Sequence, residues 1–243
     1  YFYNEEWEAA YARERLSNHE VSFLKGCTTD YVDLKDDQAE VLSVFVNSPV
    51  DKATLDRFPK LKHIATRSTG FEHIDCVEAK ARGISISSVP SYGENTVAEF
   101  TFGLLLMVSR KLYESVNKVR EEGLFSQEGL RGFDLMGKTI GVLGTGRIGA
   151  HVIRMAKGFG MNVIALDAHP NEERARELGF TYVSFEDFLS QSDVITMHLP
   201  YMKETHHIIN VNNIDKIKKG CVLINTARGG LVETAALVKG LRE

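Results

Sequence analysis

Cysteine, proline and tryptophan are scarce in this chain, whose 243 residues include three cysteines, five prolines and one tryptophan. Cys27, Cys76 and Cys221 are far apart and odd in number, and they show neither disulfide spacing nor the spacing of metal ligands. Because unpaired cysteine is among the most buried residue types, we expect reduced, buried thiols in a cytoplasmic protein. We expect no metal site.

The sequence also lacks a long apolar run and a surplus of positive charge. Its longest apolar run, FGLLLMV at 102–108, is too short to cross a bilayer, and its first residues do not follow the signal-peptide pattern. The 29 lysines and arginines are scattered among 33 acidic residues, and the net charge is −4. No basic stripe marks a nucleic-acid-binding face, so neither nucleic acid nor membrane is expected as a partner.

The two ends of the sequence are unlike those of a whole protein. The first residue is not methionine, and the last residues, ALVKGLRE, stop inside a helical pattern. We therefore expect the chain to be a fragment of a longer protein.

Short apolar, β-rich runs alternate with helical patterns along the chain, which indicates parallel βαβ units. The first part has expected strands at 21–24, 41–46, 63–68 and 84–88, and expected helices at 51–58 and 74–83. The second of these helices ends at Gly83, where glycine favours a left-handed cap. After Lys138, strands are expected at 139–144, 162–167, 181–184, 193–200 and 221–227. Helices are expected between them at 171–179, at 185–191 and near 212–218, and again from Glu233.

The segment 94–123 is one long helical pattern, apolar at first and charged later, that ends at Gly123. A helix of this kind can begin buried between domains and emerge into solvent. We therefore expect two α/β domains, 1–94 and 95–243, each with a doubly wound parallel sheet.

The segment VLGTGRIGAHVIRMAKGFGMNVIALD, at 142–167, has three glycines at the spacing G-x-G-x-x-G. The motif follows an apolar strand pattern, and a helix is expected to open at the third glycine. In a dinucleotide-binding turn, Gly144 permits the tight turn, Gly146 lets the pyrophosphate approach the backbone, and Gly149 lets the helix pack on the strand. The N-terminus of the helix supplies free N–H groups for the phosphates.

Asp167 ends the next strand, 18 residues after the third glycine. A carboxylate there can accept hydrogen bonds from both ribose hydroxyls and would repel a 2′-phosphate, which favours NAD over NADP. Arg147 either contacts the phosphates or is a solvated residue of the first helical turn. The alternative for the whole motif is a plain strand, turn and helix with an incidental aspartate.

The segments VLGTGRIG, VIALD, SDVITMHLPYMKETHHIIN and CVLINTARGGLVE together resemble the D-isomer-specific 2-hydroxyacid dehydrogenases. The resemblance extends over nearly the whole chain, because RSTGFEHID and VPSYGENTVAEF are similar to the family's substrate loop and to the start of its interdomain helix. The tyrosine of VPSYGEN is closer to the D-lactate dehydrogenase branch than to the phosphoglycerate branch. The resemblance implies a flavodoxin-like substrate domain and a Rossmann NAD-binding domain. It also implies a homodimer, and FTFGLLLMV suits either a dimer interface or an ordinary core.

The resemblance also implies which residues hold the cofactor, NAD. Leu199, Pro200 and Thr205 are expected near the adenine, and Thr96 presents its hydroxyl from the start of a helix. His198 is expected to support the cofactor rather than to donate a proton. The expected cofactor-binding residues are Thr96, Gly144, Gly146, Arg147, Ile148, Gly149, Asp167, His198, Leu199, Pro200, Thr205, Thr226 and Ala227.

Arg228, in the segment NTARGG, is the substrate-binding and catalytic arginine that the resemblance implies, and a surface salt bridge is its alternative role. A guanidinium can bind the carboxylate of a 2-oxo acid and polarise its carbonyl. Thr69 and Gly70 follow an expected strand, where backbone N–H groups can form an anion nest or an ordinary turn. The family uses this loop for the substrate carboxylate. Tyr92 either closes the pocket or packs as core, and we interpret His73 as structural.

The reaction that the resemblance implies is hydride transfer between nicotinamide C4 and C2 of a 2-oxo acid, with D-lactate and pyruvate as the expected pair. A protonated histidine, held by a glutamate, would exchange a proton with the carbonyl. In the family both residues come after the NTARGG segment, so we expect this chain to lack them, and Glu233 follows Arg228 too closely to be that glutamate. The alternatives are a dehydrogenase of the hydroxyisocaproate, glycerate or phosphoglycerate type, an NAD-sensing corepressor-like binding protein, and a catalytically silent scaffold.

Overall fold

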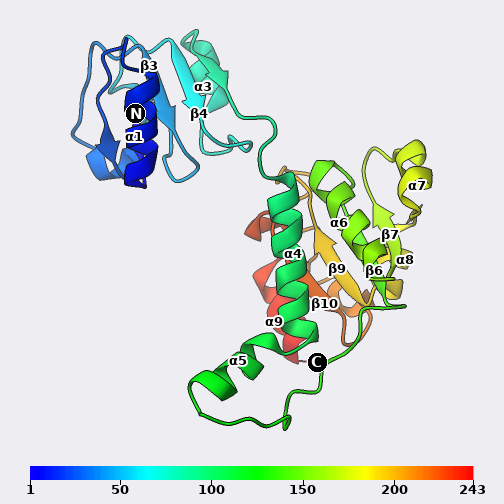
Figure 1. The fold of residues 1–243 in the computed structure, drawn as a ribbon. Coiled ribbons are helices and arrows are strands. Elements are labelled where there is room, and N and C mark those ends of the chain that lie inside the picture. Colours follow the sequence, from blue (N-terminus) through cyan, green and yellow to red (C-terminus); the bar gives the residue numbers. More distant parts are fainter. Residues whose placement is uncertain (243) are drawn as a thin grey trace. The chain divides into compact units, whose positions relative to one another are not determined.

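The computed structural model describes residues 1–242, which form two compact units (Figure 1). The first unit is Tyr1–Tyr92 and the second begins at Gly93, close to the boundary expected near residue 94. In both units, parallel strands alternate with helices along the chain. The expected α/β class is therefore confirmed.

The first unit contains a three-stranded parallel sheet in the order β3-β4-β5 and a two-stranded parallel sheet of β1 and β2. Its strands are β1 (Phe2–Tyr3), β2 (Leu24–Lys25), β3 (Val41–Val44), β4 (His63–Thr66) and β5 (Ser85–Ser87). Its helices are α1 (Glu6–Arg15), the 3-10 turn Thr28–Tyr31, α2 (Lys52–Leu55) and α3 (Cys76–Ala81). Three of the four expected strands are present in shorter form, and the strand expected at 21–24 is displaced to Leu24–Lys25. The sequence did not predict β1 or α1, since only two alanines of α1 are buried.

Local capping explains where the helix before β5 begins and ends. The carboxylate of Asp75 accepts a hydrogen bond from the N–H of Glu78, which caps the first turn of α3. The chain then reverses at Gly83, whose φ of +71° is the left-handed conformation that was expected there. The core of this unit is formed by the side chains of Phe2, Leu42, Val44, Val50, Leu55, Phe58, Leu61, Ile64, Ile74, Ala79 and Ile84.

The second unit is built on a five-stranded parallel sheet in the order β10-β9-β6-β7-β8. The strands are β6 (Thr139–Leu143), β7 (Asn162–Leu166), β8 (Thr181–Tyr182), β9 (Val194–Met197) and β10 (Val222–Asn225). Counted from β6, the order is 5-4-1-2-3, so successive strands first proceed to one side of β6 and then to the other. This is the order of a Rossmann sheet, with its switch point between β6 and β9.

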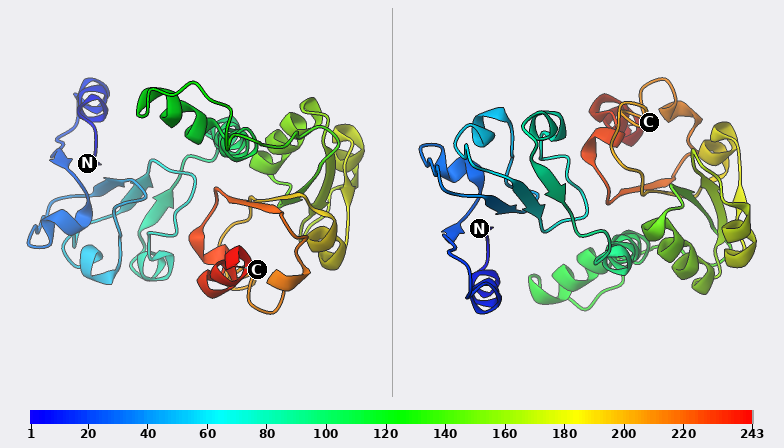
Figure 2. Two further views of the ribbon diagram at one scale, coloured as in Figure 1. Left: turned by 90° about the horizontal axis from the view of Figure 1, so that it is seen from below. Right: turned by 90° about the horizontal axis from the view of Figure 1, so that it is seen from above.

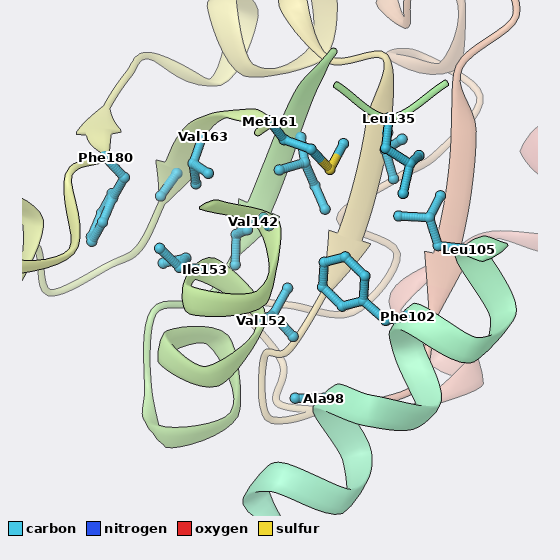
Figure 3. Close-up of a cluster of buried hydrophobic side chains, with 14 of the residues drawn as sticks. Ala98, Phe102, Leu105, Leu135, Val142, Val152, Ile153, Met161, Val163 and Phe180 are labelled. Atoms are coloured by element: carbon cyan, nitrogen blue, oxygen red, sulfur yellow. The ribbon is translucent and has the colours of Figure 1, made fainter. Parts of the chain in front are cut away.

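Helices cover both faces of this sheet. They are α4 (Glu94–Ser109), α6 (Arg147–Gly158), α7 (Glu172–Leu178), α8 (Phe185–Gln191) and α9 (Thr234–Arg242). On one face, Phe102 of α4 and Val152 of α6 belong to the same buried cluster (Figure 3). On the opposite face, Phe188 of α8 and Ala236 of α9 pack with Met197 of β9, and Figure 2 shows α9 across the sheet from α4.

Two helical expectations in the second unit were wrong. The pattern at 94–123 forms two helices, α4 and α5 (Leu112–Arg120), because Lys111 has a left-handed φ of 55°. The carbonyl of Ser109 accepts the N–H of Phe133 instead of extending the helix, and α5 projects away from the rest of the unit (Figure 1). The helix expected near 212–218 is a 3-10 turn, Ile214–Lys216, which Ile217 ends in an extended conformation.

The three cysteines are free, as expected, but each is only partly buried, so the expectation of buried thiols was wrong in degree. Burial raises the pKa of Cys221 to about 12, which keeps this thiol protonated and unreactive near neutral pH.

Candidate functional site

The carboxyl ends of β6 and β9 meet at the switch point of the second sheet. Leu143 pairs with Met197 in the ladder, and the N–H of His198 donates to the carbonyl of Leu143 at 2.7 Å. In open α/β sheets, ligands bind in the crevice outside this edge. The glycine motif and the segment after β9 therefore lie where a ligand is expected.

The three glycines of the motif have different surroundings. Gly144 has a φ of +95°, and a Cβ there would lie 2.7 Å from the carbonyl oxygen of His198. A Cβ on Gly149 would lie 2.0 Å from the carbonyl oxygen of Gly144, so this position has no room for a side chain. A Cβ on Gly146 would meet no heavy atom within 4 Å. The backbone at Gly146 is therefore open to an incoming group, as the approach of a pyrophosphate requires.

Helix α6 begins at Arg147 with Gly146 as its N-cap, two residues before the third glycine, at which it was expected to open. Its first internal hydrogen bond runs from Ala150 N–H to the carbonyl of Gly146. The N–H groups of the first turn, which includes Ile148, are thus left for an anion. Arg147 forms an ion pair with Glu94 at 3.5 Å, which brings the first turn of α4, including Thr96, beside the first turn of α6.

Asp167 follows β7, and its carboxylate lies over the glycine turn. Its Oδ2 accepts the backbone N–H of Thr145 at 2.6 Å and the hydroxyl of Thr145 at 2.9 Å. Its Oδ1 accepts the N–H of His169 at 2.9 Å. Partial burial raises the pKa of Asp167, but these hydrogen bonds outweigh burial, and the pKa lies below its ordinary value. The carboxylate is therefore ionised at neutral pH.

The hydrogen bonds around Asp167 have a fixed direction. Thr145 gives its hydroxyl proton to Asp167, so the Tyr182 hydroxyl, 2.7 Å away, must donate to Thr145. The backbone N–H of Asn171 donates in turn to Tyr182 at 3.1 Å. Three of about four acceptor positions on the carboxylate are used in this arrangement. One position, on Oδ1, remains for a ribose hydroxyl, where the sequence had suggested two.

His198 is held in a form that cannot act as an acid. Burial lowers the pKa of His198 to about 4, so the imidazole is neutral at pH 7. Its Nε2 lies 2.9 Å from the hydroxyl of Thr196. This geometry agrees with a supporting position and disfavours the proton-donor alternative.

The loop after His198 is braced by Thr205. The hydroxyl of Thr205 donates to the carbonyl of Pro200 at 2.7 Å and accepts the N–H of Met202 at 2.8 Å. Thr205 is buried, so it fixes the loop that carries Leu199 and Pro200 rather than presenting its hydroxyl to a ligand. The side chain of Leu199 would lie 3.0 Å from a Cβ on Gly144, which places Leu199 against the glycine turn.

The turn after β10 carries Arg228. The side chain of Asn225 stabilises this turn through two hydrogen bonds. It accepts the N–H of Ala227 at 3.0 Å and donates to the carbonyl of Arg228 at 2.8 Å. The Arg228 side chain is exposed, and its Nη1 donates to the carbonyl of Ala227 at 3.1 Å. Sequence reasoning missed Asn225, although an asparagine at the end of a strand is a recognised turn signal.

The hydroxyl of Thr226 faces the protein itself. Thr101 of α4 donates to the carbonyl of Val97, so Thr226 donates to Thr101 at 3.0 Å. This hydroxyl is therefore used within the protein and is not presented to a ligand.

In the first unit, Thr69 and Gly70 form a loop beyond β4. The hydroxyl of Thr69 donates to the carbonyl of Val89 at 2.8 Å, and the N–H of Val89 donates to the carbonyl of Ser68. Among residues 1–242, the N–H groups of Thr69 and Gly70 have no hydrogen-bond partner. They are available to an anion. Tyr92, at the end of this unit, is an exposed side chain.

These features define the second unit as a Rossmann dinucleotide-binding domain. Residues 102–243 match the family model described as "D-isomer specific 2-hydroxyacid dehydrogenase, NAD binding domain". The chain belongs to this family of D-isomer-specific 2-hydroxyacid dehydrogenases, which confirms the resemblance and the expected cofactor, NAD. The open backbone at Gly146, the free first turn of α6 and the ionised Asp167 fit that cofactor.

Individual relatives carry more specific names. The chain is 37% identical to the D-lactate dehydrogenase of Escherichia coli over 205 residues, 84% of this chain and 62% of that protein. It is 40% identical to the glyoxylate reductase of Thermococcus litoralis over 212 residues, 85% of this chain and 64% of that protein. The chain thus spans less than two thirds of either relative.

A solved structure of a D-lactate dehydrogenase is similar to this chain over nearly its whole length. The D-lactate dehydrogenase of Aquifex aeolicus complexed with NAD and lactic acid has a TM-score of 0.89 and 35% identity to this chain. The match covers 99% of this chain and 72% of that one. Among the described residues, no helix is long and apolar enough to cross a membrane. Residues 1–242 also contain no cluster of three or more histidine, cysteine or acidic side chains that could hold a metal ion.

Proposed function

We propose that this chain is part of an NAD-dependent dehydrogenase that interconverts a D-2-hydroxy acid and a 2-oxo acid, with D-lactate and pyruvate as the pair. The observation that carries the proposal is the proximity of two features on one sheet edge. The glycine turn follows β6, and Arg228 follows β10 on the same edge. The names of the Escherichia coli and Aquifex aeolicus relatives support lactate.

Each proposed residue has a physical task. NAD, when bound, supplies or accepts the hydride at C2 of the acid. Gly146 and the first turn of α6 hold the pyrophosphate, and the ionised Asp167 holds the adenosine ribose. Arg228, always charged, binds the substrate carboxylate and polarises the 2-oxo group. Thr69 and Gly70 offer N–H groups to a substrate carboxylate, and Tyr92 contacts the substrate.

The supporting cofactor residues complete the proposal. Thr96 and Arg147 lie beside the phosphate position, while His198, Leu199 and Pro200 line the crevice along the switch point. Three further residues shape the crevice indirectly: Thr205 through the loop after β9, and Thr226 and Ala227 through the turn after β10. In this scheme the first unit is the substrate domain, and the second is the NAD-binding domain that also carries Arg228.

The test uses the full-length protein that contains this chain: it is the oxidation of NADH with pyruvate, glyoxylate, hydroxypyruvate and bulkier 2-oxo acids, followed by the handedness of the product. We expect the highest kcat/KM with pyruvate and a D product. Preference for glyoxylate, the substrate in the name of the Thermococcus litoralis relative, would replace the lactate assignment. NADH binding without turnover of any acid would favour a sensor or a scaffold.

Arg228→Lys and Arg228→Ala separate charge from shape at the substrate position. Lysine keeps the charge but loses the planar fork. We expect KM for the 2-oxo acid to rise by about tenfold in Arg228→Lys and about a hundredfold in Arg228→Ala, with NADH affinity unchanged. Equal KM in all three proteins would remove Arg228 from the substrate site.

We also propose that the protein is a cytoplasmic homodimer, in which a second copy covers the apolar side chains of the α5 arm, the segment 112–125 that consists of α5 and the residues directly after it. No residue of α5 is buried within the described chain. Val116, Val119, Leu124 and Phe125 of this arm are all exposed, Phe125 completely. Light scattering would test the proposal. We expect Phe125→Glu to give monomers, and Val77→Glu, at an exposed apolar site on α3, to leave the dimer intact. A monomeric wild type would contradict it.

A further inference from the structure

A row of buried hydroxyls lies behind the Thr69–Gly70 loop. Thr66 and Ser68 are 3% and 1% exposed, and their hydroxyl oxygens are 2.6 Å apart. Ser68 also lies 2.7 Å from the carbonyl oxygen of Gly70. On the other side, Nε2 of His73 lies 3.1 Å from the hydroxyl oxygen of Thr66. The row thus connects an imidazole to the backbone of the loop.

The number of available protons fixes which group is the donor in each hydrogen bond of this row. The carbonyl of Gly70 only accepts, so Ser68 must give it its single hydroxyl proton. The contact between Thr66 and Ser68 then needs the proton of Thr66. Thr66 has no proton left, so Nε2 of His73 must be the donor in the third contact. His73 therefore carries a proton on Nε2.

The direction of the Gly70 carbonyl has a consequence for the loop. In a trans peptide, the C=O and the following N–H point in opposite directions. Because Ser68 holds the Gly70 carbonyl toward the buried hydroxyls, the N–H of Phe71 points away from them. Among the described residues, the N–H groups of Thr69, Gly70 and Phe71 have no partner. Successive free N–H groups of this kind bind anions.

We infer that His73 is a positioning residue: through Thr66 and Ser68 it fixes the peptide between Gly70 and Phe71, whose N–H adjoins the N–H groups of Thr69 and Gly70 that receive the substrate carboxylate. This inference rests on the proposed function, in which Thr69 and Gly70 contact the 2-oxo acid. It gives His73 a defined task where the sequence indicated only a structural residue. The task needs a donor at the Nε2 position, and not an acid or a base.

Two variants at this position test the inference in the full-length protein that contains this chain. Leucine removes the donor, whereas the amide nitrogen of glutamine can replace Nε2–H. We expect His73→Leu to raise KM for pyruvate by about tenfold, with a smaller change in kcat and an unchanged Kd for NADH. His73→Gln should return KM to within about threefold of wild type.

His63→Leu is the matched control. His63 lies in β4 of the same unit and contacts the hydroxyls of Ser85 and Ser87 at 2.8 and 2.9 Å, but not the loop. We expect its KM to be unchanged. If His73→Leu and His63→Leu have the same KM while wild type is active, the inference is wrong and the proposed function stands.

A second measurement does not depend on activity. Long-range ¹H–¹⁵N spectra report which ring nitrogen of a histidine is protonated, and the His73→Gln variant assigns the signal. We expect a protonated Nε2. A neutral ring with its proton on Nδ1 alone would overturn the inference, even if no 2-oxo acid were turned over and the proposed function itself failed.

Discussion

Asp167 accepts two hydrogen bonds from one residue, Thr145, through the backbone N–H at 2.6 Å and the hydroxyl at 2.9 Å. This pair joins the end of β7 to the glycine turn that follows β6. The carboxylate is therefore oriented before any ligand arrives, and preorganised groups lose less entropy on binding.

Replacing Asp167 by asparagine should weaken NADH binding. The amide lacks the charge and has one acceptor oxygen, so the ribose loses a charge-assisted hydrogen bond. We expect Kd for NADH to rise by about tenfold, and Kd for NADPH to change less because repulsion of its 2′-phosphate is relieved. Fluorescence titration of both cofactors measures this.

Asp193→Asn is the control for that experiment. Asp193 precedes β9, so it lies at the edge of the sheet opposite the crevice, where it accepts the N–H of Thr139 and pairs with Lys218. We expect its Kd for NADH to match wild type. An equal loss of NADH affinity in both variants would indicate a general effect of removing a carboxylate.

The lowered pKa of Asp167 predicts how its contribution to stability depends on pH. Because the folded-state pKa lies below the ordinary value, the stabilisation is complete above about pH 4 and is lost as the pH falls through the folded-state pKa. Thermal melts of wild type and Asp167→Asn should differ most near neutral pH and converge in acid. A difference that grew in acid would have the wrong sign.

His198 should be dispensable for proton transfer. Its pKa of about 4 leaves it neutral at the pH of the reaction. We expect His198→Gln to lower kcat/KM by less than about tenfold and to leave the pH–rate profile between about pH 6 and 8 unchanged, whereas a general acid contributes about 10² to 10⁴. If an ionisation seen in the wild-type pH–rate profile were absent from this variant, His198 would be the proton donor of the reaction.

Much of the second unit could be predicted because its signals are local. The apolar runs of β6, β7 and β9, the glycine spacing and Asp167 lie within short stretches of sequence. The contacts that orient the site are different. Thr145 meets Tyr182 across 37 positions, and Thr101 meets Thr226 across 125. Such polar pairs follow from the fold and leave no periodic pattern in the sequence.

The predictions that were wrong also depend on contacts between residues that are distant in the sequence. The pattern at 94–123 is helical throughout, and the sequence reveals neither the left-handed backbone at Lys111 nor the hydrogen bond from the N–H of Phe133 to the carbonyl of Ser109 at the break. Likewise, the role that we infer for His73 depends on the direction of the hydrogen bonds through Thr66 and Ser68. Residue types suggested a loop that binds anions, but only the geometry connects His73 to it.

The measurement that tests the account most directly is the affinity of Gly146→Val for NADH, with its thermal melting temperature. Nothing lies within 4 Å of a Cβ at Gly146, and its φ is −63°, so the fold should tolerate the side chain that would fill the pyrophosphate position. We predict a melting temperature near that of wild type and a Kd for NADH at least about tenfold higher. Equal affinity in the two proteins, or a wild type that does not bind NADH, would contradict the assignment of this turn to the cofactor.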